Sequence, residues 1–260
     1  MKIVFLGAGN LATNLAHALY QHNHSIVQVY SRTIENASQL AKKIYAKPID
    51  TIQDLNKQAD LYILSLKDDA LYEIIPRLPD IPAVFVHTAG SVPMSIFEGA
   101  VKNYGVFYPL QTFNKTRIVG FSEIPVFLEA NTSDNYKMIE ELACQISSEV
   151  QPANSDDRLS IHVAAVFACN FTNFMFVGAD EILQKHNLSF HHLKPLIQET
   201  FAKVQQSPPA EVQTGPAVRA DSQTIQAHLN ILSDSGMWQK LYRFVSDRIV
   251  EYYNTGNEKR

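Results

Sequence analysis

Apolar residues in the first half of the chain form short runs separated by longer amphipathic stretches. The runs lack the polar alternation of a half-exposed strand, which is typical of strands buried on both faces of a mostly parallel sheet. They predict strands at residues 2–7, 25–30, 60–66, 83–88, 105–108 and 124–128. Helical periodicity predicts helices at 10–22, 34–45, 70–77, 96–102 and 134–146. This alternation predicts a doubly wound, mostly parallel α/β sheet of the Rossmann type.

The pattern changes after Pro152, because no convincing strand pattern follows between residues 156 and 253. Helices are predicted instead at 156–186, 189–206, 222–233 and 236–254. The first of these helices is apolar almost all round, which indicates that other helices bury it. Because the helical half of the chain has only about a hundred residues, this burial can require a second subunit. We therefore expect a dinucleotide-binding domain at 1–152 and an all-α domain for dimerisation and substrate binding at 153–260.

The turn after the first predicted strand has the sequence GAGNLA at residues 7–12, a G-x-G-x-x-A pattern. In such a turn Gly7 allows the tight bend and Gly9 lets the backbone approach a pyrophosphate. The helix that begins at Asn10 and Leu11 offers free N–H groups to the phosphates. These four residues are predicted to bind a dinucleotide. The alternative is a glycine turn that only joins a strand to a helix.

The second predicted strand ends at Ser31 and Arg32, where an NAD-selective site usually has Asp or Glu. A hydroxyl and a guanidinium suit a 2′-phosphate, which an acidic residue would repel. The pattern therefore favours NADP(H). In the alternative, Ser31 or Thr33 merely caps the next helix and Arg32 is solvated, and the two interpretations are compatible.

Ligands of open α/β sheets bind beyond the carboxyl ends of the strands. This rule selects Ser65 and Leu66 after the third predicted strand, and His87 and Thr88 after the fourth, as residues of the cofactor cleft. For His87, a hydrogen-bonded structural role is the alternative. Gln111 follows the next strand and is a candidate substrate ligand, although its segment could equally be a rigid turn.

The long apolar helix carries a polar stripe. At 100° per residue, His162, Cys169 and Asn173 fall on one narrow face, and Asn170 lies about 80° away. Such groups must find partners or lose hydration free energy. They either hydrogen-bond to neighbouring helices or face a cleft between the domains, where His162 would act as general acid or base and both asparagines would meet the substrate.

The segment at 213–221 combines a Gly-Pro turn with Thr214 and Arg219. Those two side chains could form an anion clamp that binds substrate. Asp221 could instead cap the following helix, with the segment serving only as a turn into it. The sequence leaves these readings open.

Bulk properties narrow the function classes. The net charge is −4 and no basic stripe is present, which argues against nucleic-acid binding. Cys144 and Cys169 are not spaced as metal ligands or as a disulfide framework, so we expect no metal and a reducing compartment. The N-terminal apolar run is too short for a signal peptide, and no uninterrupted apolar run has membrane-spanning length. A cytoplasmic protein without a membrane partner is expected.

These features resemble the pyrroline-5-carboxylate reductase-like superfamily, which includes deazaflavin-dependent NADP oxidoreductases and the 3-hydroxyacid and 6-phosphogluconate dehydrogenases. GAGNLA, the Ser31-Arg32 strand end, LSLK at 64–67 and the helical second half carry the resemblance. The chain is most similar to bacterial Rossmann-like proteins with a second domain of unknown function, through HTAGS at 87–91, YPLQTF at 108–113, the helix at 162–173 and the loop at 213–221.

The resemblance implies NADP-linked reductase ancestry and a helical dimerisation domain like the C-terminal domain of 6-phosphogluconate dehydrogenase. Hydroxyacid dehydrogenases have a Lys with an Asn four residues later in the first interdomain helix, where this chain has His162 and Val166. The leading hypothesis is an NADP(H)-dependent oxidoreductase that acts on a small imine, ketone or hydroxyacid, with its site in the interdomain cleft. The alternative is an NADP(H)-binding sensor or regulatory protein without turnover.

Overall fold

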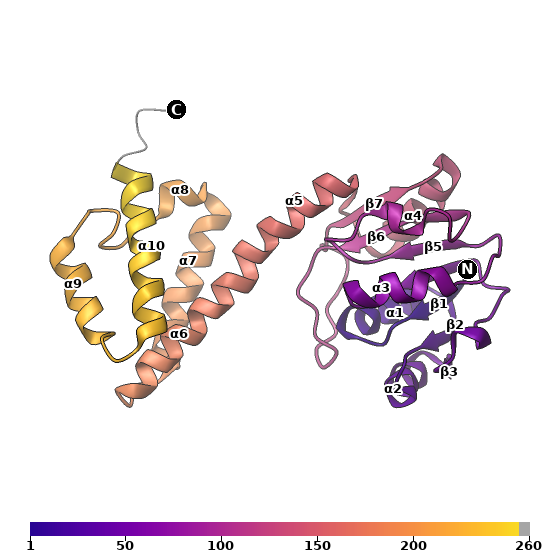
Figure 1. The fold of residues 1–260 in the computed structure, drawn as a ribbon, viewed down its shortest axis with the longest axis horizontal. Helices are drawn as coiled ribbons and strands as arrows, with labels where there is room; N and C mark the ends of the chain where they lie inside the picture. The colour runs from indigo at the N-terminus through magenta and orange to yellow at the C-terminus, as the bar shows by residue number, and fades with distance from the viewer. Residues whose placement is uncertain (255–260) are drawn as a thin grey trace. The chain divides into compact units, whose positions relative to one another are not determined.

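The structure is a computed structural model that describes residues 1–254 (Figure 1). It forms two compact units: unit 1 comprises Met1–Asn170, and unit 2 begins at Phe171. The boundary expected at residue 152 coincides with the end of the last strand. Unit 1 nevertheless continues into the long helix that follows, because the first part of that helix packs on the sheet domain.

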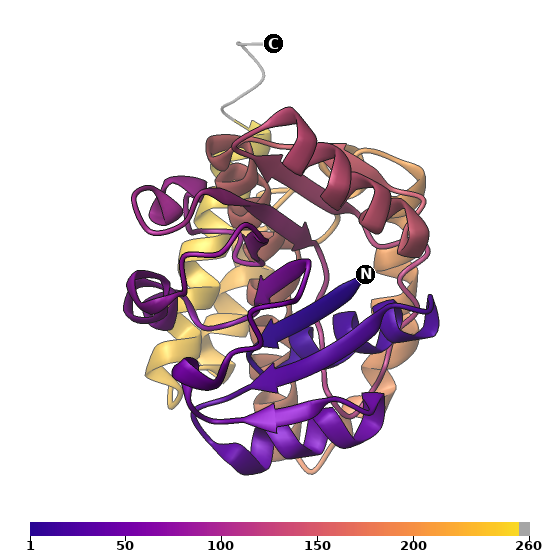
Figure 2. The same cartoon turned by 90° about the vertical axis from the view of Figure 1, so that its right-hand side faces the viewer.

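Unit 1 is built on an eight-stranded sheet with the order β3-β2-β1-β4-β5-β6-β7-β8 (Figure 2). Within the described residues, the β6–β7 pair is antiparallel and the other pairs are parallel. This confirms the predicted α/β class. The strands are β1 Lys2–Leu6, β2 Ser25–Tyr30, β3 Lys47–Ile49, β4 Leu61–Leu64, β5 Val84–His87, β6 Asn103–Pro109, β7 Val126–Ala130 and β8 Val150–Pro152.

The helices of unit 1 follow the predicted pattern with one exception. They are α1 Asn10–Gln21, α2 Ile34–Ile44, α3 Asp68–Ile74, α4 Ser133–Ile146 and α5 Ser155–Ala165, with short 3₁₀ helices at Ile52–Asp54, Ile75–Arg77 and Met94–Phe97. The helix expected at 96–102 is therefore only the last of these short turns. The edge strands β3 and β8 were not predicted, because each has three residues, one of them proline, and shows no periodicity.

Both faces of the sheet are covered, as continuous apolar strands require. Along β1, Ile3 and Phe5 belong to one buried cluster, with side chains from α1, α2 and α4. Val4 and Leu6 belong to a second cluster, with side chains from α3 and the 3₁₀ helices. These four β1 side chains are fully buried. The sheet is thus a rigid platform, and its carboxyl edge is where a ligand can bind.

Unit 2 is helical throughout its described residues. Its helices are α6 Thr172–Lys185, α7 Lys194–Gln206, α8 Pro209–Val212, α9 Ser222–Ile231 and α10 Gly236–Asn254, with a 3₁₀ turn at Phe190–Leu193. Helix α5 continues through a π-helical turn at Val166–Phe171 into α6, so the predicted single helix is present but contains an irregular turn. The π turn marks the boundary between the two units.

Unit 2 buries few apolar side chains of its own. Gly178 lies against the Trp238 ring, which packs on Phe174 with ring centroids 5.1 Å apart. Other large apolar side chains of the unit, such as Leu196 and Phe244, are exposed. The helix Ser155–Lys185 is long and apolar enough to cross a membrane by length and composition, although polar residues such as His162 and Asn170 interrupt its apolar run. One helix of this kind does not by itself establish a span.

Candidate functional site

The sheet has a switch point between β1 and β4, where the strand order reverses and an α/β sheet binds its ligand. Gly7 lies there with φ +118°, and its N–H donates a 2.8 Å hydrogen bond to the Tyr30 carbonyl. A Cβ on Gly7 would lie 2.0 Å from the Ser65 carbonyl oxygen. Glycine is therefore needed at this position by the backbone conformation and by the approach of β4.

Gly9 has a different role, because a Cβ there would meet no atom within 4 Å. Gly9 is the N-terminal cap residue of α1, no side chain caps the helix, and its first turn contains no acidic residue. The positive end of the helix dipole therefore faces open space beside the glycine turn. This arrangement fits the diphosphate of a dinucleotide, which needs N–H donors and room close to the backbone.

A cavity of about 400 Å³ lies over this turn; we call it the nucleotide cavity. Seven of the predicted cofactor residues line it: Gly7, Gly9, Asn10, Ser31, Arg32, Ser65 and Leu66. The Arg32 guanidinium lies 3.6 Å from the Glu73 carboxylate, and both side chains are about two-thirds exposed, so solvent weakens this ion pair. Arg32 thus lies at the edge of the cavity, where it can reach a phosphate.

The structure does not show the alternative in which Ser31 or Thr33 caps α2 with its side chain. Thr33 occupies the N-cap position of α2, but its side chain makes no capping hydrogen bond. The Ser31 hydroxyl accepts a long, 3.4 Å hydrogen bond from the Thr33 N–H. Both side chains on the cavity wall thus retain hydrogen-bonding capacity for a ligand.

A larger cavity, of about 850 Å³, adjoins the first, because both are lined by Gly9, Asn10, Ser65, Leu66 and Lys67. The predicted residues Leu11, Thr88, Gln111, His162 and Asn170 line it as well. Most of the remaining wall is apolar. We call it the reaction cavity, because it extends from the phosphate turn to the polar side chains of the long helix.

His162 meets an unpredicted partner in the reaction cavity. Its Nδ1 lies 3.2 Å from the hydroxyl of Tyr108, at the carboxyl end of β6. The two rings are nearly perpendicular, with centroids 6.3 Å apart. Burial raises the pKa of Tyr108, and the nearby Arg158 charge partly opposes this rise. A neutral phenol hydrogen-bonded to an imidazole can supply or transmit a proton.

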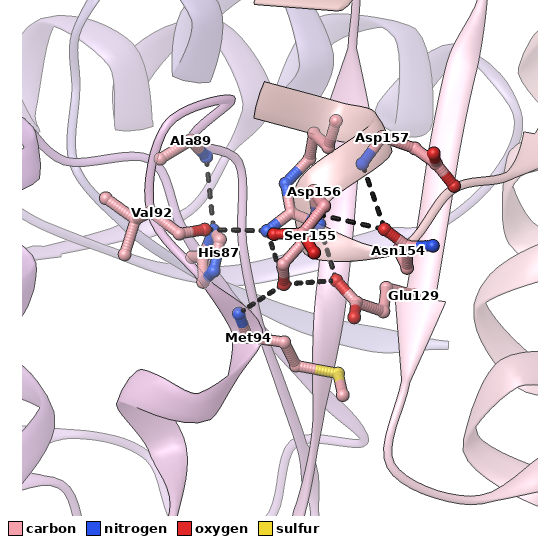
Figure 3. A network of polar contacts seen from close by, with 10 residues as sticks. His87, Ala89, Val92, Met94, Glu129, Asn154, Ser155, Asp156 and Asp157 are labelled. Atoms are coloured by element: carbon pink, nitrogen blue, oxygen red, sulfur yellow. Dashed lines mark hydrogen bonds and ion pairs between the residues drawn. The ribbon is translucent and has the colours of Figure 1, made fainter. Parts of the chain in front are cut away.

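Arg158 fixes the first turn of α5 against the sheet. Its guanidinium is buried, lies 2.5 Å from the Glu129 carboxylate and donates a 2.6 Å hydrogen bond to the Val92 carbonyl. Ser155 donates to Glu129 and accepts from the Met94 N–H (Figure 3). The network ties α5 to β7 and to the segment after β5. It therefore holds the helix turn that precedes His162 in a defined position.

His87, predicted to line the cofactor cleft, is fully buried and lines neither cavity. Its ring stacks on Phe97 at 5.7 Å, and its Nδ1 accepts a hydrogen bond from the Ala89 N–H. Burial, helped by the Arg158 charge, lowers the pKa of His87 to about 3, so the ring is neutral. The structure thus corrects this prediction and supports the structural alternative. Thr88, one residue later, reaches the cavity.

The polar stripe is only partly assembled as predicted. His162, Val166 and Cys169 line the reaction cavity, and so does Asn170, which 100° periodicity places off the stripe. The reason is the π turn at Val166–Phe171, which changes the angle between successive side chains. Asn173 lies beyond this turn in unit 2 and does not line the reaction cavity.

The two predicted anion ligands also belong to unit 2. Thr214 lines a separate, mostly apolar cavity of about 340 Å³ within that unit, and Arg219 is exposed. Asp221 caps α9, because its carboxylate accepts hydrogen bonds from the N–H and hydroxyl of Thr224. This supports the alternative in which Asp221 caps the helix. It gives no support to an anion clamp formed by Thr214 and Arg219.

Two polar side chains on the cavity walls, Tyr108 and Lys115, were not predicted from the sequence. Tyr108 was predicted as the last residue of a strand but not as a site residue, although the rule that selected His87 applies equally to it. Lys115 lines the nucleotide cavity because its loop is held over α1: Asn10 accepts from the Lys115 N–H, and Asn14 bonds to the carbonyl of Asn114. This long-range contact leaves no local signal in the sequence.

Two family models match the chain. Residues 2–86 match the family described as "NADP oxidoreductase coenzyme F420-dependent", and residues 124–249 match a domain of unknown function, DUF2520. The second match covers the end of the sheet, α5 and most of unit 2. The pairing of the two domains agrees with the resemblance derived from the sequence.

The crystal structure of a candidate NADP oxidoreductase from Bacteroides fragilis is 48% identical to the chain over 96% of this chain and 98% of that one, with a TM-score of 0.91. The chain belongs to this family of NADP oxidoreductases. Family membership confirms the predicted oxidoreductase class and the predicted cofactor, NADP(H). Among curated proteins no match was found.

More distant structures share the fold of this NADP oxidoreductase. A reductive aminase from Aspergillus terreus, in complex with NADPH and ethyl-5-oxohexanoate, is 14% identical over 96% of this chain and 93% of that one, with a TM-score of 0.73. A 1-pyrroline-5-carboxylate reductase from Streptococcus pyogenes is 14% identical over 96% and 98% of the two chains, with a TM-score of 0.64. At this identity they establish the fold alone.

Proposed function

We propose that the protein transfers a hydride between NADP(H) and a small polar metabolite of the imine, ketone or hydroxyacid type. The observation that supports this most is that the two cavities adjoin and share part of their walls. One contains a phosphate-binding turn with Ser31 and Arg32, and the other contains the polar pair of Tyr108 and His162. A dinucleotide that follows the shared wall would bring its reactive end toward that pair.

Different predicted cofactor residues would bind different parts of the dinucleotide. The open room at Gly9 and the N–H groups of Asn10 and Leu11 would hold the diphosphate. Ser31 and Arg32 would hold the 2′-phosphate, since a hydroxyl and a planar guanidinium both donate to phosphate oxygens. Ser65, Leu66 and Thr88 would line the path toward the reaction cavity.

In the reaction cavity, NADP(H) supplies or accepts the hydride. His162 would hold the proton that the substrate exchanges, and the amides of Asn170 and Gln111 would orient the polar group of the substrate. The surrounding apolar side chains would exclude water and strengthen these hydrogen bonds. Asn173, Thr214 and Arg219 remain predicted substrate ligands from unit 2.

A homodimer through the helical unit, in the cytoplasm, is also part of the proposal. Large exposed apolar side chains on α7 and α10, among them Leu196 and Phe244, support it, because such patches usually mark contact surfaces. A light-scattering mass of twice 29.2 kDa at micromolar concentration is expected. A stable monomer would contradict this part of the proposal.

Fluorescence titration with NADPH and NADH tests the cofactor assignment. NADPH is expected to bind about tenfold more tightly, and Arg32→Ala should remove that preference while leaving NADH unchanged, because it removes a 2′-phosphate ligand. Glu73→Ala is the matched control and should not weaken NADPH, because it removes only the surface partner of Arg32. An equal loss for both cofactors in Arg32→Ala would refute the assignment.

NADPH oxidation followed with a panel of imines, ketones and hydroxyacids tests turnover. Oxidation that depends on one substrate class is expected. Tight NADPH binding without any oxidation across the panel would instead favour the sensor.

A further inference from the structure

Tyr108 and His162 come from separate parts of the chain and meet at one point of the reaction cavity. Tyr108 stands at the end of β6, paired with Phe127 across the antiparallel step of the sheet. His162 is on α5, one turn after the buried Arg158. Both line the cavity, and the Tyr108 hydroxyl lies 3.2 Å from His162 Nδ1. Among the described residues, His162 is the only hydrogen-bond partner of the Tyr108 hydroxyl.

The Tyr108 and His162 rings leave no room for a side chain at Gly90. A Cβ at Gly90 would lie 2.8 Å from His162 Nδ1 and 2.8 Å from Tyr108 Cζ. Its backbone has no positive φ, so its conformation does not require glycine. What requires glycine is the meeting of the two rings directly above the loop after β5.

We propose that Tyr108 is the group that gives the proton to the reducible C=N or C=O bond of the substrate, and that His162 replaces that proton through Nδ1. This inference rests on the proposed function and adds a catalytic residue to it. It also makes His162 the second member of a relay, where the residue pattern alone had suggested a direct acid.

The balance of the step is simple. The substrate carbon takes the hydride that NADPH supplies, and the substrate nitrogen or oxygen takes the proton from Tyr108 Oη. The O–H bond of Tyr108 breaks as the doubly protonated, cationic form of His162 gives its Nδ1 proton to Oη and becomes a neutral imidazole. His162 then regains a proton from solvent. One hydride and one proton are consumed, and both side chains return to their starting states.

The surroundings favour a relay over a free tyrosinate. Burial raises the pKa of Tyr108, so a phenolate that is not reprotonated at once is costly. The titratable and charged groups around the pair are Arg158 on α5, Glu129 on β7, the neutral His87 on β5, Lys67 and Asp68 after β4, and Cys169 in the π turn. Arg158 is paired with Glu129, and its charge offsets only part of the rise in the pKa of Tyr108 that burial causes.

The first arm of the test needs no substrate. NMR titration of the His162 ring is followed in the wild-type protein, in Tyr108→Phe and in Tyr104→Phe; the last is a control on the same strand that does not line the cavity. Losing one hydrogen bond should move the titration midpoint of the His162 ring in Tyr108→Phe. In Tyr104→Phe it should not move. An unmoved midpoint in Tyr108→Phe overturns the relay.

The second arm measures NADPH oxidation with 2-methyl-1-pyrroline as the C=N probe and cyclohexanone as the C=O probe. Tyr108→Phe should lower kcat about 100-fold or more and leave NADPH affinity within about twofold. His162→Gln should lower kcat less and change the pH profile of kcat, because glutamine cannot replace the proton on Tyr108. Full activity in Tyr108→Phe, or an unchanged pH profile in His162→Gln, overturns the proposal.

The two arms separate this inference from the proposed function. If NADPH fails to bind the wild-type protein, the proposed function fails, and the NMR arm still decides whether the rings share a proton. If NADPH binds but neither probe is reduced, the NMR arm decides alone. Gly90→Ala gives a further check: the added methyl should separate the rings and reproduce the NMR shift of Tyr108→Phe.

Discussion

The two units bury their apolar residues to very different extents. In unit 1, every side chain of β4 and β5 is buried, and two clusters fill both faces of the sheet. In unit 2, α7 has no buried residue, and α10 has two. Unit 1 therefore has the core of an independently stable domain. Unit 2 instead exposes apolar side chains that a contact surface could bury.

The two units also differ in whether their ion pairs are buried or exposed. Unit 1 contains a buried ion pair, Arg158 with Glu129, and a fully buried His87. The ion pairs of unit 2, such as Lys185 with Asp234, are on the surface. The side chains of the reaction cavity are thus positioned by buried contacts, and substitutions in unit 1 should have larger and more specific effects than those in unit 2.

The largest effect is expected for Arg158→Met. It leaves the Glu129 carboxylate without its buried partner and should lower the free energy of unfolding by about 3–5 kcal/mol. Arg219→Met, an exposed arginine of unit 2, should change it by less than about 0.5 kcal/mol. Urea unfolding followed by circular dichroism measures both. Equal effects would mean that the buried pair contributes no more than a surface charge.

The next effect concerns the exposed face of unit 2. Phe244→Asp or Leu196→Asp should weaken the expected dimer by about 2–4 kcal/mol, because a charge is placed in an apolar contact. Tyr72→Asp in unit 1 is the control: Tyr72 is 58% exposed, close to the 63% of both Leu196 and Phe244. Sedimentation velocity over a concentration series gives the dissociation constants. A dimer that both unit 2 variants leave intact would place the contact elsewhere.

The two glycines of the β1 turn make a sharper comparison within unit 1. Gly7→Ala places a methyl against the Ser65 carbonyl at positive φ and should lower the free energy of unfolding by about 2 kcal/mol or more. Gly9→Ala meets open space and should change it by less than about 0.5 kcal/mol. It should nevertheless weaken NADPH binding about tenfold, because the methyl takes the place of the diphosphate. Calorimetry measures both properties, and similar stability losses in the two variants would contradict the assignment.

The smallest effect is a pH dependence from His87. Its pKa is about 3 in the folded protein and about 6.5 when unfolded, so the unfolded chain binds one more proton between these values. Stability should therefore fall by about 1.4 kcal/mol for each pH unit below 6.5, in addition to other groups. His87→Gln should remove this contribution, which urea unfolding at pH 6.5 and 5.5 would reveal. A wild-type protein and variant with the same pH dependence would contradict the neutral, buried ring.

Much of unit 1 could be predicted from local patterns. Apolar runs without alternation identify β1, β2, β4 and β5, and the glycine turn identifies the switch point, because these features depend on neighbours in the chain. The edge strands β3 and β8 could not be predicted, since a three-residue strand with a proline is stabilised by its neighbour in the sheet.

The site was predictable only where one strand end or one helix face defines it. Ser31, Arg32 and His162 line the cavities as expected. Asn170 reaches its cavity through a π turn, which 100° periodicity does not anticipate. The partnership of Tyr108 and His162 depends on the packing of α5 on the sheet by way of Arg158, and a single sequence contains no local signal for that contact.

The central claim is that backbone amides of the β1 turn in unit 1 hold the diphosphate of NADP(H). Hydrogen–deuterium exchange with and without NADPH tests it most directly. The account predicts slower exchange at Asn10, Leu11 and Ala12 when NADPH is added, in wild-type protein but much less in Gly9→Ala. Unchanged exchange at these three amides, with protection confined to unit 2, would contradict it.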